Sequence, residues 1–130
     1  MQTQIKSQNS TSTSKRFVIV LLEEFAIYSF GSLLDALRIA NALSGKALYN
    51  WIVLAENGAI IRSSARTEIK VDFGLMELKR DDTVLICGGL NVQQNTTKNL
   101  VSWIRRQARK GVSIGGVDTG SYAVARAGLL

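Results

Sequence analysis

Hydrophobic and polar positions along the chain fall into alternating blocks. Four short runs are apolar at nearly consecutive positions, as buried parallel strands are, and they cover residues 17–22, 51–55, 83–87 and 112–114. Longer stretches repeat apolar residues with a helical period, and they cover residues 30–42, 95–110 and 120–127. Strands alternating with helices predict an α/β domain whose mostly parallel sheet lies between two helical layers.

Local signals refine this plan, which is that of the flavodoxin-like class of folds. Asn57-Gly58 is a strong turn signal, and we expect residues 59–62 to pair with residues 67–71, where apolar and charged residues alternate. Ser29 or Ser32 is expected to cap the first helix, and Gly111 to cap the end of the second.

The two ends of the chain differ from its middle. Residues 1–15 are mostly Ser, Thr, Gln and Asn, with almost nothing to bury, and predict a disordered tail. The last four residues follow directly on a predicted helix, and Leu129 and Leu130 are typical of the approach to another apolar element. We therefore expect the sheet to be incomplete at the C-terminus.

Composition narrows the classes of protein that fit. A chain of 130 residues with 46% hydrophobic content fits one domain. It has one cysteine, Cys87, and no histidine, which excludes an internal disulfide and a metal framework, so we expect no metal and no cofactor. Without a membrane-spanning run of roughly 18 to 20 apolar residues or a signal peptide, we expect a cytoplasmic protein with no membrane partner.

The net charge of +6 raises the question of an acidic partner such as nucleic acid. The basic residues are spread along the chain, however, and form a single cluster at Arg105, Arg106, Arg109 and Lys110. On the predicted helix these four lie away from the apolar stripe, which is typical of a solvated face.

The candidate chemistry lies in the turn Gly115–Gly120, where a strand leads into a helix. Small residues on both sides of Asp118 predict a tight elbow that exposes this side chain, as nucleophile elbows do. Three interpretations remain open: Asp118 caps the helix by accepting a hydrogen bond from Gly120 or Ser121, contacts a ligand, or acts as an aspartyl nucleophile. The last needs a base, ordinarily histidine, which the chain lacks.

Other candidates follow neighbouring strands. Cys87 ends a strand among apolar residues, which favours core packing over a nucleophile. Glu23 and Glu24 follow the first strand, and one of them is expected to line a cleft while the other is solvated. The expected ligand-binding residues at this edge of the sheet are Glu24, Phe25, Tyr28, Gly88, Gly89, Asp118, Thr119 and Ser121.

Three segments together carry a family resemblance: FVIVLLEEFAIYSFGSLLDALRIAN, TVLICGG and GVSIGGVDTGSYAVARAGLL. They resemble the ThiJ/PfpI branch of the class I glutamine-amidotransferase-like superfamily, and most of all the N-terminal domains of GlxA-type regulators of the AraC class. The resemblance covers residues 16–130 as a partial domain. In active members of the superfamily the elbow position, here Asp118, holds a cysteine, and an acidic helper residue aligns loosely with Tyr28, so both positions depart from the catalytic pattern.

The resemblance implies a non-catalytic, ligand-sensing domain of an AraC-class transcription regulator. It implies a homodimer and a small-molecule effector such as an amine, a betaine or an amino acid, which Asp118 and the aromatic residues Phe25 and Tyr28 would contact. DNA would be bound by a helix-turn-helix module that this chain lacks. The alternatives are an amidase- or protease-like hydrolase of the same superfamily, against which Asp118 and Tyr28 both count, and a truncated gene product that folds poorly.

Overall fold

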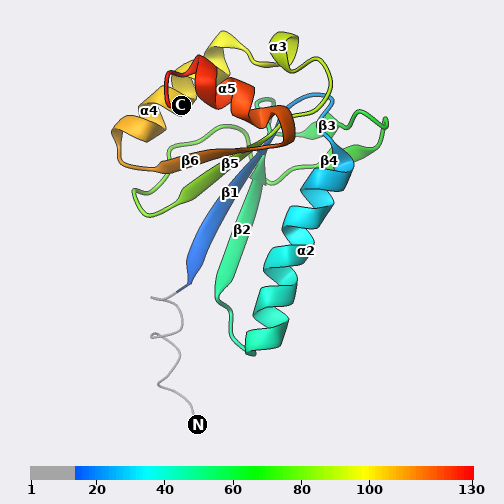
Figure 1. The fold of residues 1–130 in the computed structure, drawn as a ribbon, viewed down its shortest axis with the longest axis vertical. Helices are drawn as coiled ribbons and strands as arrows, with labels where there is room; N and C mark the ends of the chain where they lie inside the picture. The colour runs from blue at the N-terminus through cyan, green and yellow to red at the C-terminus, as the bar shows by residue number, and fades with distance from the viewer. Residues whose placement is uncertain (1–13) are drawn as a thin grey trace.

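Four parallel strands form the centre of the computed structural model, which describes residues 14–130 (Figure 1). The strands are β1 (Lys15–Leu21), β2 (Tyr49–Leu54), β5 (Thr83–Cys87) and β6 (Ser113–Val117). Their order across the sheet is β2-β1-β5-β6, and every neighbouring pair is parallel. The four expected strands and their parallel arrangement are confirmed.

Helices cover both faces of this sheet. Helix α2 (Ile27–Ser44) lies on one face, and α4 (Lys98–Arg109) and α5 (Ser121–Arg126) lie on the other (Figure 1). Alternate residues of β1 supply the two cores, since Val18 and Val20 pack toward α4 and α5 whereas Ile19 and Leu21 pack on the α2 side. The expected three-layer α/β fold is confirmed.

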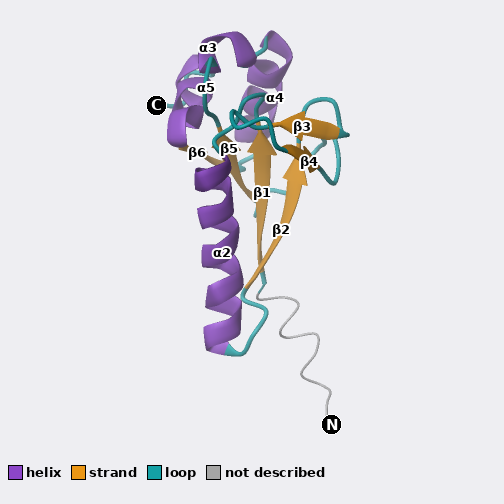
Figure 2. Cartoon of the chain, turned by 90° about the vertical axis from the view of Figure 1, so that its right-hand side faces the viewer, coloured by secondary structure: helices purple, strands orange, loops and turns teal. Residues whose placement is uncertain are grey.

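A small hairpin stands apart from the main sheet. It pairs β3 (Ile60–Arg62) with β4 (Glu68–Lys70) in antiparallel fashion, with Ile61 opposite Ile69 (Figure 2). The buried Ser63 shapes its turn, because its hydroxyl oxygen accepts the backbone N–H groups of Ala65 and Thr67 at 3.1 Å each. The expected hairpin is confirmed.

Helix ends are where the sequence-based expectations fail. Helix α2 begins at Ala26 without a side-chain cap, so the expected cap by Ser29 or Ser32 is wrong. The helix expected over residues 95–110 is α4, which begins only at Lys98, and a separate short helix that was not expected, α3 (Val92–Asn95), precedes it. The division falls at Thr97, whose hydroxyl oxygen caps α4 by accepting the Leu100 N–H at 3.0 Å. Gly111 lies one residue beyond the Lys110 cap, at a φ of +95°.

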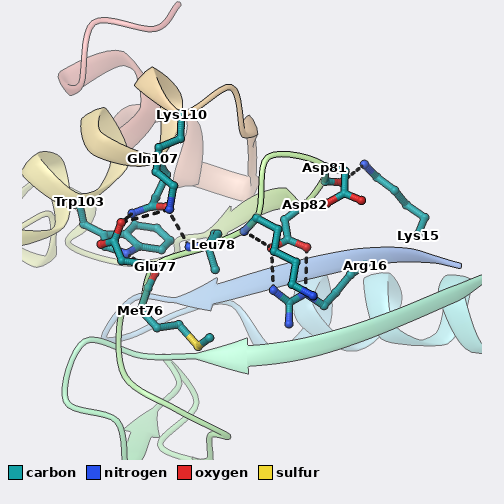
Figure 3. A network of polar contacts seen from close by, with 11 residues as sticks. Lys15, Arg16, Met76, Glu77, Leu78, Asp81, Asp82, Trp103, Gln107 and Lys110 are labelled. Atoms are coloured by element: carbon teal, nitrogen blue, oxygen red, sulfur yellow. Dashed lines mark hydrogen bonds and ion pairs between the residues drawn. The ribbon is translucent and has the colours of Figure 1, made fainter. Parts of the chain in front are cut away.

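The segment between β4 and β5 is fastened to α4 by buried polar groups (Figure 3). Gln107 is fully buried, and its Oε1 accepts the Leu78 N–H at 3.1 Å. The Trp103 indole N–H donates to the Met76 carbonyl at 2.8 Å. Because these partners satisfy groups that packing removes from water, the irregular segment is held without a strand or helix of its own.

A second polar group links β1 to the start of β5 (Figure 3). The Arg16 guanidinium donates to both carboxylate oxygens of Asp82, at 2.9 and 2.6 Å, and the Lys79 N–H adds a third bond at 2.8 Å. Burial raises the pKa of Asp82, but these bonds and the Arg16 charge outweigh it, so the pKa lies below its ordinary value.

Two further expectations concern the N-terminal tail and the membrane. Most of the expected N-terminal tail lies outside the described residues, although Lys15 already belongs to β1. Among the helices of residues 14–130, none has the length and apolar character to cross a membrane.

Candidate functional site

The loops that follow β1, β5 and β6 meet at one edge of the sheet. Leu21, Cys87 and Val117 are register partners in adjacent strands, so the residues after them emerge side by side. This edge carries the carboxyl ends of the strands, where open α/β sheets bind ligands. The expectation that Glu24, Gly88 and Asp118 come from one edge is therefore confirmed.

The loop after β6 is a tight elbow. Asp118 has a φ of +57°, a left-handed conformation that few non-glycine residues adopt, and it opens the short helix η1 (Asp118–Gly120). A Cβ on Gly120 would collide with the carbonyl oxygen of Ile86, and one on Gly116 would collide with the backbone of Ser121. Glycine at both positions is thus required for the elbow to lie against β5 and α5.

The carboxylate of Asp118 has two partners, neither of them a helix cap. Its Oδ1 accepts the Thr119 N–H at 2.8 Å, and its Oδ2 accepts the Ser29 hydroxyl at 2.9 Å. The interpretation of Asp118 as a helix cap is wrong, because no side chain caps α5 and the Oδ1 of Asp118 bonds to Thr119 and not to Gly120 or Ser121. Asp118 instead joins the elbow to the first turn of α2.

The α2 residue that bonds to the elbow is Ser29, whereas the family resemblance aligns Tyr28 with the helper position. Tyr28 is 84% exposed, and the α2 side chain that bonds to Asp118 is that of Ser29, so the alignment of Tyr28 with the helper position stays a prediction. Successive residues of an α-helix point about 100° apart, so a shift of one residue decides which side chain faces the elbow. Ser29 had been interpreted only as a helix cap.

Gly88 and Gly89 permit the three loops to touch. A Cβ on Gly88 would lie 2.7 Å from both the Gly120 nitrogen and the Thr119 hydroxyl oxygen, and one on Gly89 would collide with the Glu24 carbonyl. The Thr119 hydroxyl donates to the Gly89 carbonyl at 2.8 Å. The space that a side chain would fill is occupied by the chain itself.

Two other expected ligand residues have clear structural roles. The Glu24 carboxylate accepts the side-chain amides of Asn91 and Asn95 at 2.8 and 3.2 Å, which ties the loop after β1 to α3. Phe25 is fully buried and packs edge-to-face on Phe30 with 5.6 Å between ring centroids. Its ring therefore has no face open to a cationic ligand. Ser121 is exposed at the start of α5.

Cys87 is a core residue, as its apolar neighbours predict. Its side chain is fully buried, and burial together with the nearby Asp118 charge raises the pKa of the thiol to about 12. A thiol with this pKa is almost entirely protonated at neutral pH and is a poor nucleophile.

A cavity of about 340 Å³ lies beyond the ends of β1 and β2, apart from the elbow. Glu23 lines it and Glu24 does not, although Glu23 is the more exposed of the two; which of them faces a ligand stays a prediction. Glu56, at the end of the second predicted strand, also lines it and was missed, although its position after a buried strand was a usable signal. The lining residues are Val20, Leu21, Leu22, Glu23, Glu56, Asn57, Ile61, Gln94, Asn95, Thr97 and Leu100.

Within residues 14–130, the structure brings together no group of three or more Cys, Asp or Glu side chains that could hold a metal ion. The elbow and the cavity both offer polar side chains at the ligand-binding edge of the sheet.

The fold and the elbow define an α/β protein with a DJ-1/ThiJ-like fold. A DJ-1 superfamily protein from Agrobacterium tumefaciens superimposes with a TM-score of 0.67 at 20% identity, over 88% of this chain and 59% of that one. An AraC family transcriptional regulator from Pseudomonas putida superimposes with a TM-score of 0.74 at 26% identity, over 89% of this chain and 62% of that one. No family model matches the chain.

Curated relatives give the assignment more detail. The HTH-type transcriptional regulator GbdR of Pseudomonas aeruginosa is 39% identical over 126 residues, which is 97% of this chain and 34% of GbdR. The HTH-type transcriptional regulator GlxA of Rhizobium meliloti is 33% identical over 121 residues, 89% of this chain and 36% of GlxA. The chain is homologous to the N-terminal, ThiJ/PfpI-like domain of these AraC-class regulators, and it spans about a third of their length.

Proposed function

We propose that this chain is a ligand-sensing domain of an AraC-class transcription regulator and that it does not catalyse a reaction. The observation that carries the proposal is the 39% identity to a transcriptional regulator over 97% of the chain. GbdR and GlxA, the two relatives described above, both bear the names of transcriptional regulators. A domain of this kind binds its effector and passes the change to a DNA-binding part.

The chemistry at the elbow supports a role without catalysis. Both carboxylate oxygens of Asp118 accept hydrogen bonds, which lowers their nucleophilicity, and the sequence has no histidine to activate water. The thiol of Cys87 is buried and protonated. The amidase- or protease-like alternative therefore has no activated nucleophile within the described residues.

The finer parts of the proposal concern partners. The effector is a small amine, betaine or amino acid, and DNA is contacted by a helix-turn-helix module outside this chain. The domain forms a homodimer in the cytoplasm. Helix α2 supports self-association, because Tyr28, Ile39 and Leu43 are exposed on it, Tyr28 and Leu43 by more than four-fifths.

A thermal-shift screen tests the sensing function. The chain is melted alone and with 10 mM of each amine, betaine and amino acid in a panel. At 100 times Kd a ligand adds about 2.7 kcal/mol to the free energy of unfolding, which raises Tm by several degrees. We expect at least one compound to do this while its neutral analogue does not. The absence of any Tm increase across the panel would contradict the proposal.

A further inference from the structure

The cavity beyond β1 and β2 combines apolar and acidic walls. Its apolar residues come from the end of β1, from β3 and from α4, and include Leu22, Ile61 and Leu100. Its charged residues are Glu23 and Glu56, from the loops that follow β1 and β2. A concave site with an apolar lining and a few converging polar groups is the usual form of a small-molecule site.

Neither glutamate is neutralised by a basic residue. The ion pairs of residues 14–130 all lie elsewhere, although the whole chain has a net charge of +6. The Glu56 carboxylate is positioned by neutral donors instead, the Thr97 hydroxyl and the Asn99 amide, each at 2.8 Å. Such donors fix the carboxylate in place and leave its negative charge available to a ligand.

The composition of the lining restricts the ligand further. It has no Lys or Arg, so an anionic ligand would meet two uncompensated negative charges. It also has no aromatic residue, and quaternary ammonium groups, which have no N–H donors, are held chiefly by aromatic faces. A primary ammonium group carries three N–H donors, which match the carboxylates and the side-chain carbonyls of Asn57 and Gln94.

We propose that this cavity, and not the elbow, is the effector site, and that it takes a small aliphatic primary amine. The carboxylates of Glu23 and Glu56 hold the ammonium group, and Leu22 and Leu100 contact the alkyl chain. The assignment rests on the proposed sensing function and narrows its ligand from amines, betaines and amino acids to one chemical class.

Calorimetric titration of the full chain with n-butylammonium tests the assignment. Two probes isolate the recognition chemistry: 1-butanol has the same chain without the charge, and n-butyltrimethylammonium has the same chain and the charge without N–H donors. We expect n-butylammonium to bind at least tenfold more tightly than either probe. Equal binding of 1-butanol or of n-butyltrimethylammonium would overturn the assignment.

Variants locate the site. We expect the double substitution E23Q/E56Q to weaken n-butylammonium binding at least tenfold, and E68Q, at an exposed position on β4, to leave Kd within twofold. E56D retains the charge and is expected to keep most of the affinity. If E56Q lowers Tm through loss of the Asn99 bond, E23Q alone carries the test. Unchanged affinity in E23Q/E56Q would refute the site.

Together with the thermal-shift screen, these measurements distinguish a failure of the cavity assignment from a failure of the sensing function. If panel compounds stabilise the chain and D118N removes that effect whereas E23Q/E56Q does not, the cavity assignment is wrong and the sensing function stands. If neither n-butylammonium nor any panel compound binds, both proposals fail.

Discussion

Asp118 shows how a residue type and a backbone conformation are matched at one position. Its φ of +57° costs most side chains about 1 kcal/mol, but Asp and Asn tolerate this region because they hydrogen-bond to the local backbone. Here the Oδ1 of Asp118 accepts the next N–H, that of Thr119. The conformation and the side chain therefore stabilise each other.

Replacing Asp118 tests this account. We expect Asp118→Ala to lower the free energy of unfolding by about 1 to 2 kcal/mol, because it combines backbone strain with the loss of two hydrogen bonds. Asp118→Asn, which keeps an acceptor and tolerates the conformation, should cost less than half as much. Urea unfolding measures both. Equal losses for the two variants would show that the charge, and not the conformation, matters.

At the scale of single residues, sequence reasoning succeeded where local chemistry decides. The core position of Cys87 followed from its apolar neighbours, and the elbow at Asp118 followed from the small residues around it. It did not foresee that Phe25 is fully buried and that Tyr28, in the first turn of α2, is 84% exposed, because packing partners far away in the sequence decide which side chains are buried. The ligand-binding role of the elbow residues remains a prediction.

Between elements, glycines determine how closely the backbone segments approach. The elbow rests directly on β5, and the carbonyl oxygen of Ile86 occupies the place where a side chain of Gly120 would begin. Gly31, in the second turn of α2, has no heavy atom within 4 Å of the corresponding position. The two glycines differ in packing and share a helical or near-helical backbone.

These two positions form a matched pair of alanine substitutions. We expect Gly120→Ala to destabilise the chain by about 3 kcal/mol, because a backbone carbonyl cannot move aside as a side chain can. Gly31→Ala should stabilise it by about 0.5 to 1 kcal/mol, since alanine is the better helix former. Thermal unfolding followed by circular dichroism checks both. A tolerated Gly120→Ala would mean that the elbow does not pack on β5.

Elements were predicted well where burial is continuous and poorly where it is not. The apolar runs within β1, β2 and β5 were found, and so was β6, although it includes Gly115 and Gly116 and is only partly buried. Helix α3 was missed and the start of α4 was placed at residue 95 instead of Lys98, because the polar residues Asn95 to Thr97 also fit the exposed side of a helix. Only the hydrogen bonds of the Thr96 and Thr97 hydroxyls, at the end of α3 and the start of α4, mark these helix boundaries.

For the molecule as a whole, the Arg16 and Asp82 pair makes stability depend on pH. The pKa of Asp82 is lower in the folded chain than its unfolded value of about 3.9, so its contribution is complete above about pH 5 and is lost as the pH falls through the folded pKa. The Asp82 side chain of this pair is buried, with 3% of its surface exposed.

The corresponding prediction compares two neighbouring aspartates. At pH 7 we expect Asp82→Asn to lower the free energy of unfolding by about 2 kcal/mol, because it leaves Arg16 without its charged acceptor. The difference from wild type should shrink as the pH falls below about 4. Asp81→Asn, at an exposed position, is the control and should change stability little. A difference for Asp82→Asn that stays constant from pH 7 to pH 3 would contradict this linkage.

The three-dimensional site was the least predictable feature. The polar lining of the cavity comes from Glu23, Glu56 and the segment from Gln94 to Thr97, which are far apart in the sequence and meet only through the strand order of the sheet. The fold class was predictable because each strand carries its own signal. The cavity was not, because it depends on which loops the sheet places next to one another.

The central claim, that the chain binds a small molecule and leaves it unchanged, is tested most directly by ligand-observed proton NMR. The chain is mixed with the panel of amines, betaines and amino acids and followed for many hours. We expect the resonances of at least one primary amine to broaden, with no new product resonances. If no compound broadened, or if product resonances grew with wild type and not with Asp118→Ala, the claim would be contradicted.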